Sequence, residues 1–547
     1  MSHTLFSRLH RQYGPRLRHT ERLGRIATLL GAPAQALAEG VSKRQEKTMW
    51  AAAGAPTQDR AEVALESQSG FYPEPDYTAN KGTVAIVGGG FAGLMAGWRL
   101  NRAGFCITIY ELNQNIGGRV ESNPQVPGSM IEAGGELIGA NHKTWLKLAI
   151  HFGLGLSSFS SDDIFDQLRL ESPVVLGGNI IAKAQQASLY AQLDLLLAQL
   201  NQDAAFVPPS APWTAPQANA WDGIPVADWL KGKTQSGNVS SQCADAFRCQ
   251  LENDQGVPIS QQSYLGLLAA VAGGAMRTLN PQDLTPSEYF TETEVFRCES
   301  GNHSLAEILA QEIRSHGGVI KTGVRVTSVT LAGGAASIDW TDVATSGNDS
   351  ASVDWVVLAT PPPTWAQMLP RALAGIASNV QTGKAVKFLA EVNDRFWLRR
   401  NLAPSATIDG FGVVWEGTDN QNLPPGARPE ISVFAGSADA QQAASHWNPD
   451  SYFSQQLEAI YPGFSANCKS MRFVNWLTRA GVNCGYSCPG VNQVTTLGDS
   501  LRGAHGRLVF AGEHTSPAFF GYMEGALESA EHAADLIIGA SSSGGRP

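Results

Sequence analysis

The clearest pattern of apolar and polar positions lies between residues 83 and 110. Thr83–Val87 is a short apolar run rich in β-branched residues, which is typical of a buried parallel strand. Ala92–Arg102 repeats apolar residues at helical spacing, and Cys106–Tyr110 is a second strand-like run. A strand, a helix and another strand within about thirty residues predict a βαβ unit.

The rest of the chain alternates the same two kinds of pattern. Helical spacing predicts helices over residues 189–200, 264–276, 304–315 and 522–538, and strand-like runs occur at 319–320, 324–326, 337–340, 353–358 and 507–511. Residues 211–221 are predicted to be a loop, 344–352 a hairpin turn, and 539–547, which are rich in serine and glycine, a disordered tail. This mixture predicts an α/β fold (α+β overall), with a Rossmann-like domain interleaved with a domain of helices over a sheet.

Composition narrows the class of protein. The chain has 547 residues, which is three to four domain-equivalents at about 150 residues each. Hydrophobic residues make up 43% and charged residues 16%, so the chain is not intrinsically disordered, and a net charge of −10 argues against a nucleic-acid partner. No apolar stretch is long enough for a membrane span. Seven scattered cysteines without CxxC and eleven histidines without HExxH predict neither a disulfide scaffold nor a metal site.

Residues 1–80 differ from the rest in character. Residues 1–40 are rich in arginine and poor in acidic residues, and residues 41–80 are polar and rich in turn formers. We expect an N-terminal arm, partly disordered or processed, that packs on a partner subunit of a homo-oligomer. The apolar stretch at 26–30 resembles part of an export signal, but the charged part before it is long and no twin arginine occurs there. We expect a cytoplasmic protein, with export left open.

Gly88–Gly93 has the form GxGxxG and lies between the first predicted strand and its helix. Gly88 permits the tight turn, Gly90 lets the backbone approach a pyrophosphate, and Gly93 allows the helix to pack closely on the strand. Glu111 ends the second strand, 23 residues after Gly88, where a carboxylate can bind a ribose 2′-hydroxyl. This arrangement predicts a dinucleotide site for FAD or NAD rather than NADP.

Several further segments, in their order along the chain, resemble the flavin amine oxidase family. These segments are Gly117-Gly118-Arg119, Met130–Gly139, Phe296–Leu305, Val324–Val329, Trp355–Pro363, Phe510–Thr515 and Gly521–Ala526. The resemblance implies FAD as cofactor and oxidative deamination as reaction. In that reaction the substrate gives a hydride to flavin N5, water hydrolyses the imine, and dioxygen is reduced to hydrogen peroxide.

The same resemblance implies which residues bind FAD. Residues 81–155, 292–375 and 480–538 are expected to build the FAD-binding domain, and residues 156–291 and 376–479 the substrate-binding domain. The expected cofactor-binding residues are Gly88, Gly90, Phe91, Ala92, Gly93, Glu111, Leu112, Gly118, Arg119, Gly134, Gly135, Glu136, Val326, Gly512, Glu513, Gly521, Tyr522 and Met523. Glu513 is expected beside the ribityl and phosphate chain, and the Met523 amide, at a helix start, is expected to stabilise charge near flavin N1 and O2.

The catalytic residues expected from the resemblance are Lys387, Trp476, Tyr486 and Tyr522. Lys387 lies in an apolar strand and should point at flavin N5 through a water, with Lys384 as the competing lysine. Tyr486 and Tyr522 should form two walls of an aromatic cage that orients a neutral amine. Animal monoamine oxidases attach their flavin to a cysteine directly before the cage tyrosine. Gly485 stands there in this chain, so we expect non-covalent FAD.

The substrate is expected to be a small molecule, an amino acid or an amine, oxidised with dioxygen. Gly134–His142 resembles a segment of bacterial and fungal L-amino acid oxidases, and we expect an FAD-dependent L-amino acid oxidase. Such an enzyme needs a buried cation for the α-carboxylate, and the candidates are Arg277, Arg297 and Arg479. The alternative is a monoamine or polyamine oxidase, with Glu288 or Glu292 holding a distal ammonium. A non-catalytic FAD-binding protein is the third hypothesis.

Overall fold

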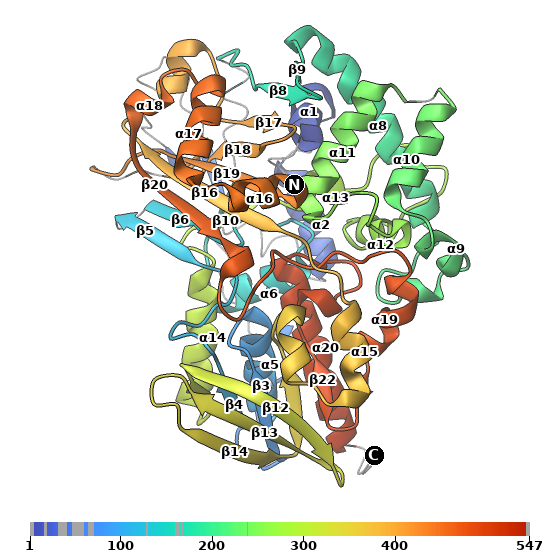
Figure 1. Ribbon diagram of the computed structural model, residues 1–547, viewed down its shortest axis with the longest axis vertical. Coiled ribbons are helices and arrows are strands. Elements are labelled where there is room, and N and C mark those ends of the chain that lie inside the picture. Colours follow the sequence, from blue (N-terminus) through green and yellow to red (C-terminus); the bar gives the residue numbers. More distant parts are fainter. Residues whose placement is uncertain are drawn as a thin grey trace.

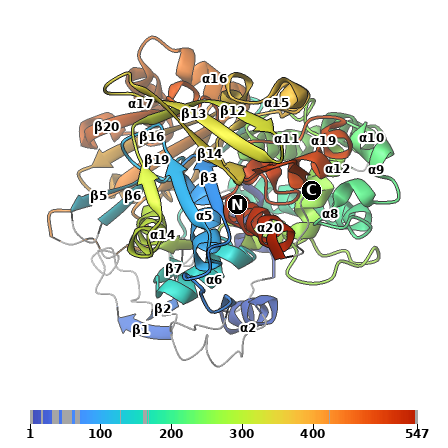
Figure 2. The same cartoon turned by 90° about the horizontal axis from the view of Figure 1, so that it is seen from below.

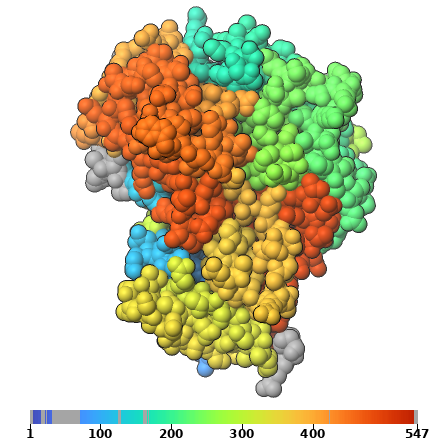
Figure 3. Space-filling model, viewed as in Figure 1, coloured from blue at the N-terminus to red at the C-terminus, as the bar shows by residue number. Residues whose placement is uncertain are grey.

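The computed structural model describes residues 5–15, 19–30, 41–45, 59–63, 71–126, 129–158, 165, 168–237, 239–421, 423 and 425–542. These residues form two halves, each built around one large sheet (Figure 1). The surface narrows to a waist between the halves (Figure 3). Much of the N-terminal arm and residues 543–547 of the tail lie outside the described residues.

The first half contains a six-stranded sheet in the order β11-β4-β3-β15-β22-β21. Its strands are β3 (Thr83–Val87), β4 (Cys106–Tyr110), β11 (Val319–Lys321), β15 (Trp355–Leu358), β21 (Ala504–His505) and β22 (Leu508–Phe510). All neighbouring pairs are parallel except β21–β22. Because both faces of a parallel sheet are covered, its central strands are almost fully buried, as their continuous apolar runs require.

Helices pack on this sheet and on each other. α5 (Phe91–Arg102) follows β3, and α14 (His303–Ser315) and α20 (Met523–Ser542) lie against α5. α6 (Lys143–Phe152) lies against α20. The sheet β12 (Val324–Ala332), β13 (Ala335–Asp342) and β14 (Asn348–Val353) covers the lower end of this half in Figure 1, and the hairpin of β5 (Ser122–Val126) and β6 (Ser129–Glu132) lies at the waist.

The second half contains a seven-stranded sheet in the order β20-β16-β19-β18-β17-β8-β9. Its strands are β8 (Val174–Leu176), β9 (Asn179–Ile180), β16 (Ala385–Val392), β17 (Ala406–Ile408), β18 (Gly412–Glu416), β19 (Glu430–Gly436) and β20 (Cys468–Asn475). The helices of this half are α8 (Lys183–Ala204), α9 (Ala218–Asp222), α10 (Val226–Gln235), α11 (Ser241–Gln255), α12 (Tyr264–Gly273), α13 (Tyr289–Glu292), α16 (Ser437–Ser445), α17 (Pro449–Ile460) and α18 (Phe464–Asn467). α15 (Ala374–Asn379) and α19 (Gln493–Arg502) lie where the two halves meet.

The N-terminal arm packs on its own chain. α1 (Leu5–Tyr13) buries Leu5, Phe6 and Leu9 against the helices of the second half. α2 (His19–Leu30) lies beside α6 (Figure 2). β1 (Val41–Gln45) and β2 (Asp59–Val63) form a hairpin that extends β7 (Leu156–Ser158) and β10 (Phe296–Cys298). The prediction that the arm packs on a partner subunit missed these contacts, because the sequence does not show which apolar face receives an amphipathic helix.

Three predicted boundaries differ from the structure. Residues 211–221 contain a 3-10 helix, Pro212–Thr214, and the start of α9, because proline at the first turn supports a helix start. The predicted turn at 344–352 is shorter, since β14 already begins at Asn348. α20 continues to Ser542, so residues 539–542 of the predicted tail are helical. No helix among the described residues has the length and hydropathy needed to cross a membrane.

Candidate active site

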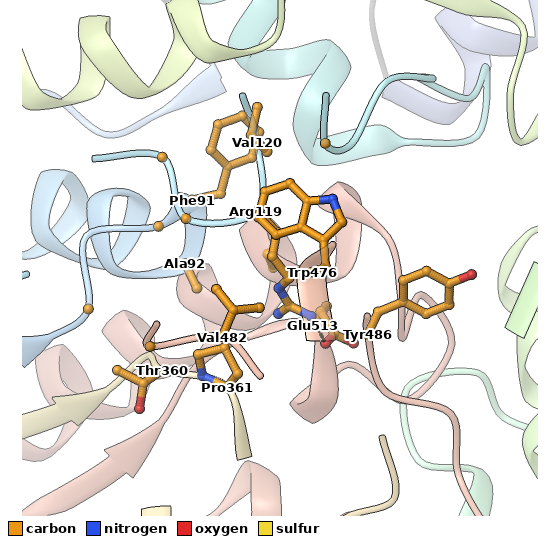
Figure 4. Close-up of a pocket in the computed structure, with 18 of the residues that line it drawn as sticks. Phe91, Ala92, Arg119, Val120, Thr360, Pro361, Trp476, Val482, Tyr486 and Glu513 are labelled. Carbon is orange, nitrogen blue, oxygen red and sulfur yellow. Dashed lines mark hydrogen bonds and ion pairs between the residues drawn. The ribbon is translucent and has the colours of Figure 1, made fainter. Parts of the chain in front are cut away.

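A cavity of about 480 Å³ extends from the glycine motif after β3 to Tyr486 and Tyr522 (Figure 4). Segments from both halves of the molecule line it. The sequence-predicted residues that line it are Gly88, Gly90, Phe91, Ala92, Glu111, Leu112, Gly118, Arg119, Gly134, Gly135, Glu136, Val326, Lys387, Trp476, Tyr486, Gly512, Glu513, Gly521, Tyr522 and Met523. Gly93 is not among the lining residues, which fits its predicted role in packing.

The glycine cradle, residues 88–93 with 117–118, forms one end of the cavity. Gly88 has a φ of +105°, which favours glycine. A Cβ on Gly93 would lie 1.9 Å from the Gly88 carbonyl oxygen, so only glycine fits there. A Cβ on Gly118 would lie 3.1 Å from the Gly90 Cα. The two loops therefore approach each other as bare backbone, which leaves amide groups at the start of α5 open to a phosphate.

Glu111 lies beside the cradle and is buried. One carboxylate oxygen accepts the Gly89 amide at 2.7 Å, and the other accepts the Asn113 amide at 2.8 Å. These bonds fix the carboxylate next to the glycine turn, where a ribose hydroxyl would meet it. The local sequence encodes this end of the cavity, since every group lies within one βαβ unit and the turn that follows it.

Lys387 lies in the middle of β16, is buried, and points into a cluster of charges. Its ammonium donates to the Glu132 carbonyl at 2.6 Å and to a Glu136 carboxylate oxygen at 2.5 Å. The other Glu136 oxygen accepts Arg297 at 2.7 Å and the Trp415 indole N–H at 3.0 Å. Burial opposes ionisation of Glu136, but Lys387 and Arg297 outweigh it and hold the pKa of this carboxyl below its usual range. Lys384, the competing lysine, is exposed.

Two further buried carboxyl groups lie within electrostatic reach of this cluster. Burial raises the pKa of Glu132 to about 7. Burial, followed by the negative charge of Glu136, raises the pKa of Glu430 to about 8. The chain therefore keeps groups that exchange protons near neutral pH close to the lysine that faces the cavity.

Tyr486 and Tyr522 lie at the other end of the cavity from the cradle. The Tyr486 ring is stacked on Phe434, with ring centroids 6.5 Å apart and an interplanar angle of 12°. The Tyr522 ring meets His142 edge-on at 5.6 Å. The Tyr486 hydroxyl donates to the Asn253 carbonyl at 3.1 Å. Both rings are therefore fixed by neighbours that the sequence did not point to.

Two carboxyl groups, Asp254 and Glu294, line the same end of the cavity. Burial, and then the charges of Asp254 and Glu294, raise the pKa of the Tyr486 hydroxyl. The same two charges contribute to a raised pKa of Tyr522, after burial and Tyr289. Burial and the charge of Glu294 also raise the pKa of Asp254. Because burial opposes ionisation of Asp254, a cation beside it would favour its charged form. Asp254 and Glu294 have no motif around them, so the sequence analysis missed them.

The arginines proposed to bind a carboxylate lie outside the cavity. Arg277 pairs with Asp283 at 2.9 Å and with Glu288 at 2.6 Å. Arg297 pairs with Glu136. Arg479 pairs with Glu121 at 2.5 Å. None of the three lines the cavity, so none is placed to bind a substrate carboxylate there, and each is already paired with an acidic residue.

The acids proposed to bind a distal ammonium also lie elsewhere. Glu292 pairs with Arg22 of α2 at 2.6 Å, and Glu288 pairs with Arg25 at 2.6 Å. Neither lines the cavity. Glu288 and Glu292 instead hold the N-terminal arm, and the acids that line the cavity near the tyrosines are Asp254 and Glu294.

The residue before Tyr486 is Gly485, which lines the cavity. Cys484 does not line the cavity; it is buried in an apolar cluster with Trp476 and Val482, and burial raises the pKa of its thiol to about 11. A thiol in this state is a poor nucleophile. The geometry therefore fits a flavin held without a covalent bond.

Comparison with known proteins identifies the family. Residues 91–538 match the family model described as flavin containing amine oxidoreductase. The chain belongs to this family. Amine oxidase [flavin-containing] B of Cavia porcellus is 23% identical over 482 residues, which cover 84% of this chain and 87% of the relative. The probable flavin-containing monoamine oxidase A of Dictyostelium discoideum is 24% identical over 467 residues, covering 82% and 95%.

Solved structures of flavin amine oxidases share the fold. A putrescine oxidase bound to putrescine superimposes with a TM-score of 0.70 at 17% identity, covering 84% of this chain and 99% of that one. Cyclohexylamine oxidase from Brevibacterium oxydans IH-35A gives 0.67 at 19% identity, covering 85% and 99%. Family membership makes this chain a flavin-dependent amine oxidoreductase. The cavity fits FAD, since it joins the backbone cradle and Glu111 to the helix start at Met523.

Proposed function

We propose that this flavin amine oxidase oxidises primary amines that carry a second positive charge, such as diamines. The amine, water and dioxygen would give an aldehyde, ammonia and hydrogen peroxide. FAD supplies the acceptor for the hydride and its reoxidation by dioxygen. The sequence alone favoured an L-amino acid oxidase, but the relatives and the charges of the cavity support the amine alternative better.

One observation carries the proposal: the cavity end at the two tyrosines holds the carboxyl groups of Asp254 and Glu294 and no candidate arginine. An α-carboxylate there would add a negative charge beside two buried carboxyl groups, which is costly. A distal ammonium would favour the ionised form of Asp254, whose pKa burial and Glu294 raise, and would pair with it. Among the described residues, two arginines line the cavity, Arg119 and Arg325. Arg119 is paired with Glu513. Arg325 lies at the cradle end, because the amide of the preceding residue, Val324, donates to the Glu111 carbonyl.

The protein's own residues would then divide the work. Tyr486 and Tyr522 would orient the neutral amine and shield it from water. Lys387 would supply a fixed positive charge, held by Glu136, at the wall of the cavity. The amide groups at the start of α20 would stabilise negative charge that the reduced cofactor carries.

A matched set of substrates tests this assignment. Butylamine, 1,4-diaminobutane and L-ornithine have chains of similar length and differ in the distal ammonium and the carboxylate. In a peroxide assay, kcat/KM for 1,4-diaminobutane should exceed that for butylamine by about 10-fold or more, since one charge interaction of this kind is worth about 1–3 kcal/mol. Of the two diamino compounds, L-ornithine should have the lower kcat/KM.

Asp254→Asn should reduce kcat/KM for 1,4-diaminobutane by about 10-fold and leave butylamine nearly unchanged. Asp222→Asn is the matched control, because Asp222 is a buried carboxylate outside the cavity. Faster oxidation of L-ornithine than of 1,4-diaminobutane would contradict the proposal and restore the L-amino acid oxidase.

A further inference from the structure

The short helix α13 connects the N-terminal arm to the tyrosine end of the cavity. On the cavity side, Tyr289 of this helix is hydrogen bonded to Tyr522. Glu294, two residues after the helix ends, lines the cavity itself. A shift of α13 would therefore move groups at the end of the cavity to which we assign the distal ammonium of the substrate.

Two helices of the arm contact α13 (Figure 1). α1 packs on it through aromatic rings, since Phe6 and Phe290 meet edge to face with their centroids 6.1 Å apart. α2 binds it through charge, since Arg22 donates to both carboxylate oxygens of Glu292, from Nε at 2.6 Å and from Nη2 at 3.2 Å. A bidentate pair of this kind fixes the direction of both side chains as well as their distance.

Glu292 joins the arm to the wall of the cavity. Its side chain is 5% exposed and that of Arg22 is 21% exposed, so the pair is largely shielded from water. The Glu292 carbonyl accepts the Ala140 amide at 2.8 Å. Two residues after Ala140, the ring of His142 meets the Tyr522 ring edge-on. One residue is thus bonded to α2 through its side chain and to the segment beside Tyr522 through its backbone.

The second ion pair of α2 differs from the first. Arg25 donates to Oε1 of Glu288 at 2.6 Å, and Arg277 lies at the same distance from the same oxygen. The Arg25 side chain is also more exposed, at 42%. Loss of Arg25 would leave Glu288 paired with Arg277, whereas loss of Arg22 removes both bonds that α2 makes to Glu292. The two arginines therefore form a natural comparison within one helix.

The family resemblance does not reach this contact. The match to the family begins at residue 91, so α13 lies within it, whereas α1 and α2 precede it. The motifs that predicted the cofactor site therefore say nothing about the arginines that hold α13. Any contribution of the arm to substrate choice has to be derived from the contacts themselves.

We propose that Arg22 is a positioning residue for substrate selection. By holding Glu292 it fixes α13, and through α13 it fixes the place of Glu294 and Tyr289 at the tyrosine end of the cavity. The arm thus acts as the outer support of the substrate site. This proposal rests on the proposed function, because it takes the carboxyl groups at this end as the site of the distal ammonium.

The first test compares substrates on the FAD-loaded full-length protein, using the ratio of kcat/KM for 1,4-diaminobutane to that for butylamine. Arg22→Gln removes the cation that balances a buried carboxylate, which shifts Glu292 toward water and α13 with it. The ratio should fall by about fivefold or more, mainly through a higher KM for the diamine. Arg25→Gln is the matched control, since it removes the same charge from the same helix. Its ratio should stay within about twofold of the wild type.

Glu292→Gln breaks the same pair from the other side and should lower the ratio in the same way. It also keeps the proposal falsifiable if Arg22→Gln fails to fold. Arg22→Gln and Glu292→Gln together should lower the ratio no further than either change alone, because both remove one interaction. Losses that multiply in the double variant would show that the two residues act separately and would overturn the proposal.

Hydrogen exchange followed by mass spectrometry reports on the segment without any substrate. Amides of residues 288–296 should exchange at least about threefold faster in Arg22→Gln than in the wild type, and at the wild-type rate in Arg25→Gln. Faster exchange with an unchanged substrate ratio would give Arg22 a purely structural role and overturn the proposal. Unchanged exchange with an unchanged ratio would overturn it as well.

The two proposals can fail separately. If the wild type does not prefer the diamine, the proposed function fails. The role of Arg22 is then decided by hydrogen exchange together with KM for the best amine. That KM should rise by about fivefold in Arg22→Gln and stay unchanged in Arg25→Gln, and equal KM values in the two variants would overturn the positioning role.

Discussion

The two ends of the cavity are built in different ways. At the cradle end, the glycine motif, α5 and Glu111 belong to one continuous stretch, and backbone groups do most of the work. At the tyrosine end, side chains from separate segments meet, and Lys387, Glu136 and Arg297 form a buried charge cluster. The cradle depends on the absence of side chains, whereas the other end depends on the balance of buried charges. The following changes should therefore have different consequences.

Gly93→Ala should have the largest effect, because its Cβ would lie 1.9 Å from a backbone oxygen that cannot move away. The strand and helix would separate, and the cradle would lose its shape. FAD affinity should fall by about 100-fold or more, measured by fluorescence titration of the apoprotein. Gly97→Ala in the same helix is the control, since its Cβ would meet only the flexible ends of isoleucine side chains. Normal FAD binding by Gly93→Ala would refute this account of the cradle.

Lys387→Met should leave FAD bound and impair the chemistry. The substitution removes the charged group that faces the cavity and leaves Glu136 paired with Arg297. Turnover should fall by about 100-fold. Lys384→Met, three residues away and exposed, should behave as the wild type in the same peroxide assay. Equal turnover in the two variants would show that Lys387 has only a structural role.

Tyr486→Leu tests the aromatic wall, with Tyr486→Phe as its control. The phenylalanine variant keeps the ring stacked on Phe434 and loses only the bond to the Asn253 carbonyl. The leucine variant loses the ring and should reduce kcat/KM for amines by about 10-fold, since an aromatic contact is worth about 0.5–1.5 kcal/mol. If the two variants have equal kcat/KM, the ring itself does not contribute to substrate binding.

Glu430→Gln should have the smallest effect, on stability. The folded-state pKa of Glu430 is raised to about 8, so the folded state holds a proton that the unfolded state releases near its ordinary pKa. Glu430 therefore adds to the free energy of unfolding at low pH, where it is protonated in both states. This contribution is lost as pH rises toward 8. The melting temperature of the variant should match that of the wild type at pH 5 and exceed it by about 1–3 °C at pH 8. A constant difference across this range would contradict the assignment.

The same contrast explains how much could be predicted from the sequence. The βαβ unit, the glycine cradle and Glu111 were predicted because their geometry depends on local spacing, and the structure has strands at Thr83–Val87 and Cys106–Tyr110. The family was also predicted correctly, since its motifs lie in order along the chain.

Pairings of charges between distant segments could not be predicted. Arg22 and Glu292 are 270 residues apart, and nothing in either neighbourhood points to the other. From the sequence Arg297 is a plausible carboxylate ligand, but in the structure it pairs with Glu136. Asp254 and Glu294 carry no motif, and their importance appears only when the fold brings them to the tyrosines. The proposal of an amine substrate therefore rests on the tertiary arrangement of charges as well as on the relatives, and not on the sequence pattern alone.

Anaerobic reduction of the bound flavin tests the central claim most directly, because it isolates the step that binds and oxidises the substrate. Mixed with equal concentrations of 1,4-diaminobutane or L-ornithine, the FAD-loaded protein should lose its absorbance near 450 nm at least about 10-fold faster with the diamine. Faster bleaching by L-ornithine would contradict the account, since it would show that the cavity binds a carboxylate despite Asp254 and Glu294.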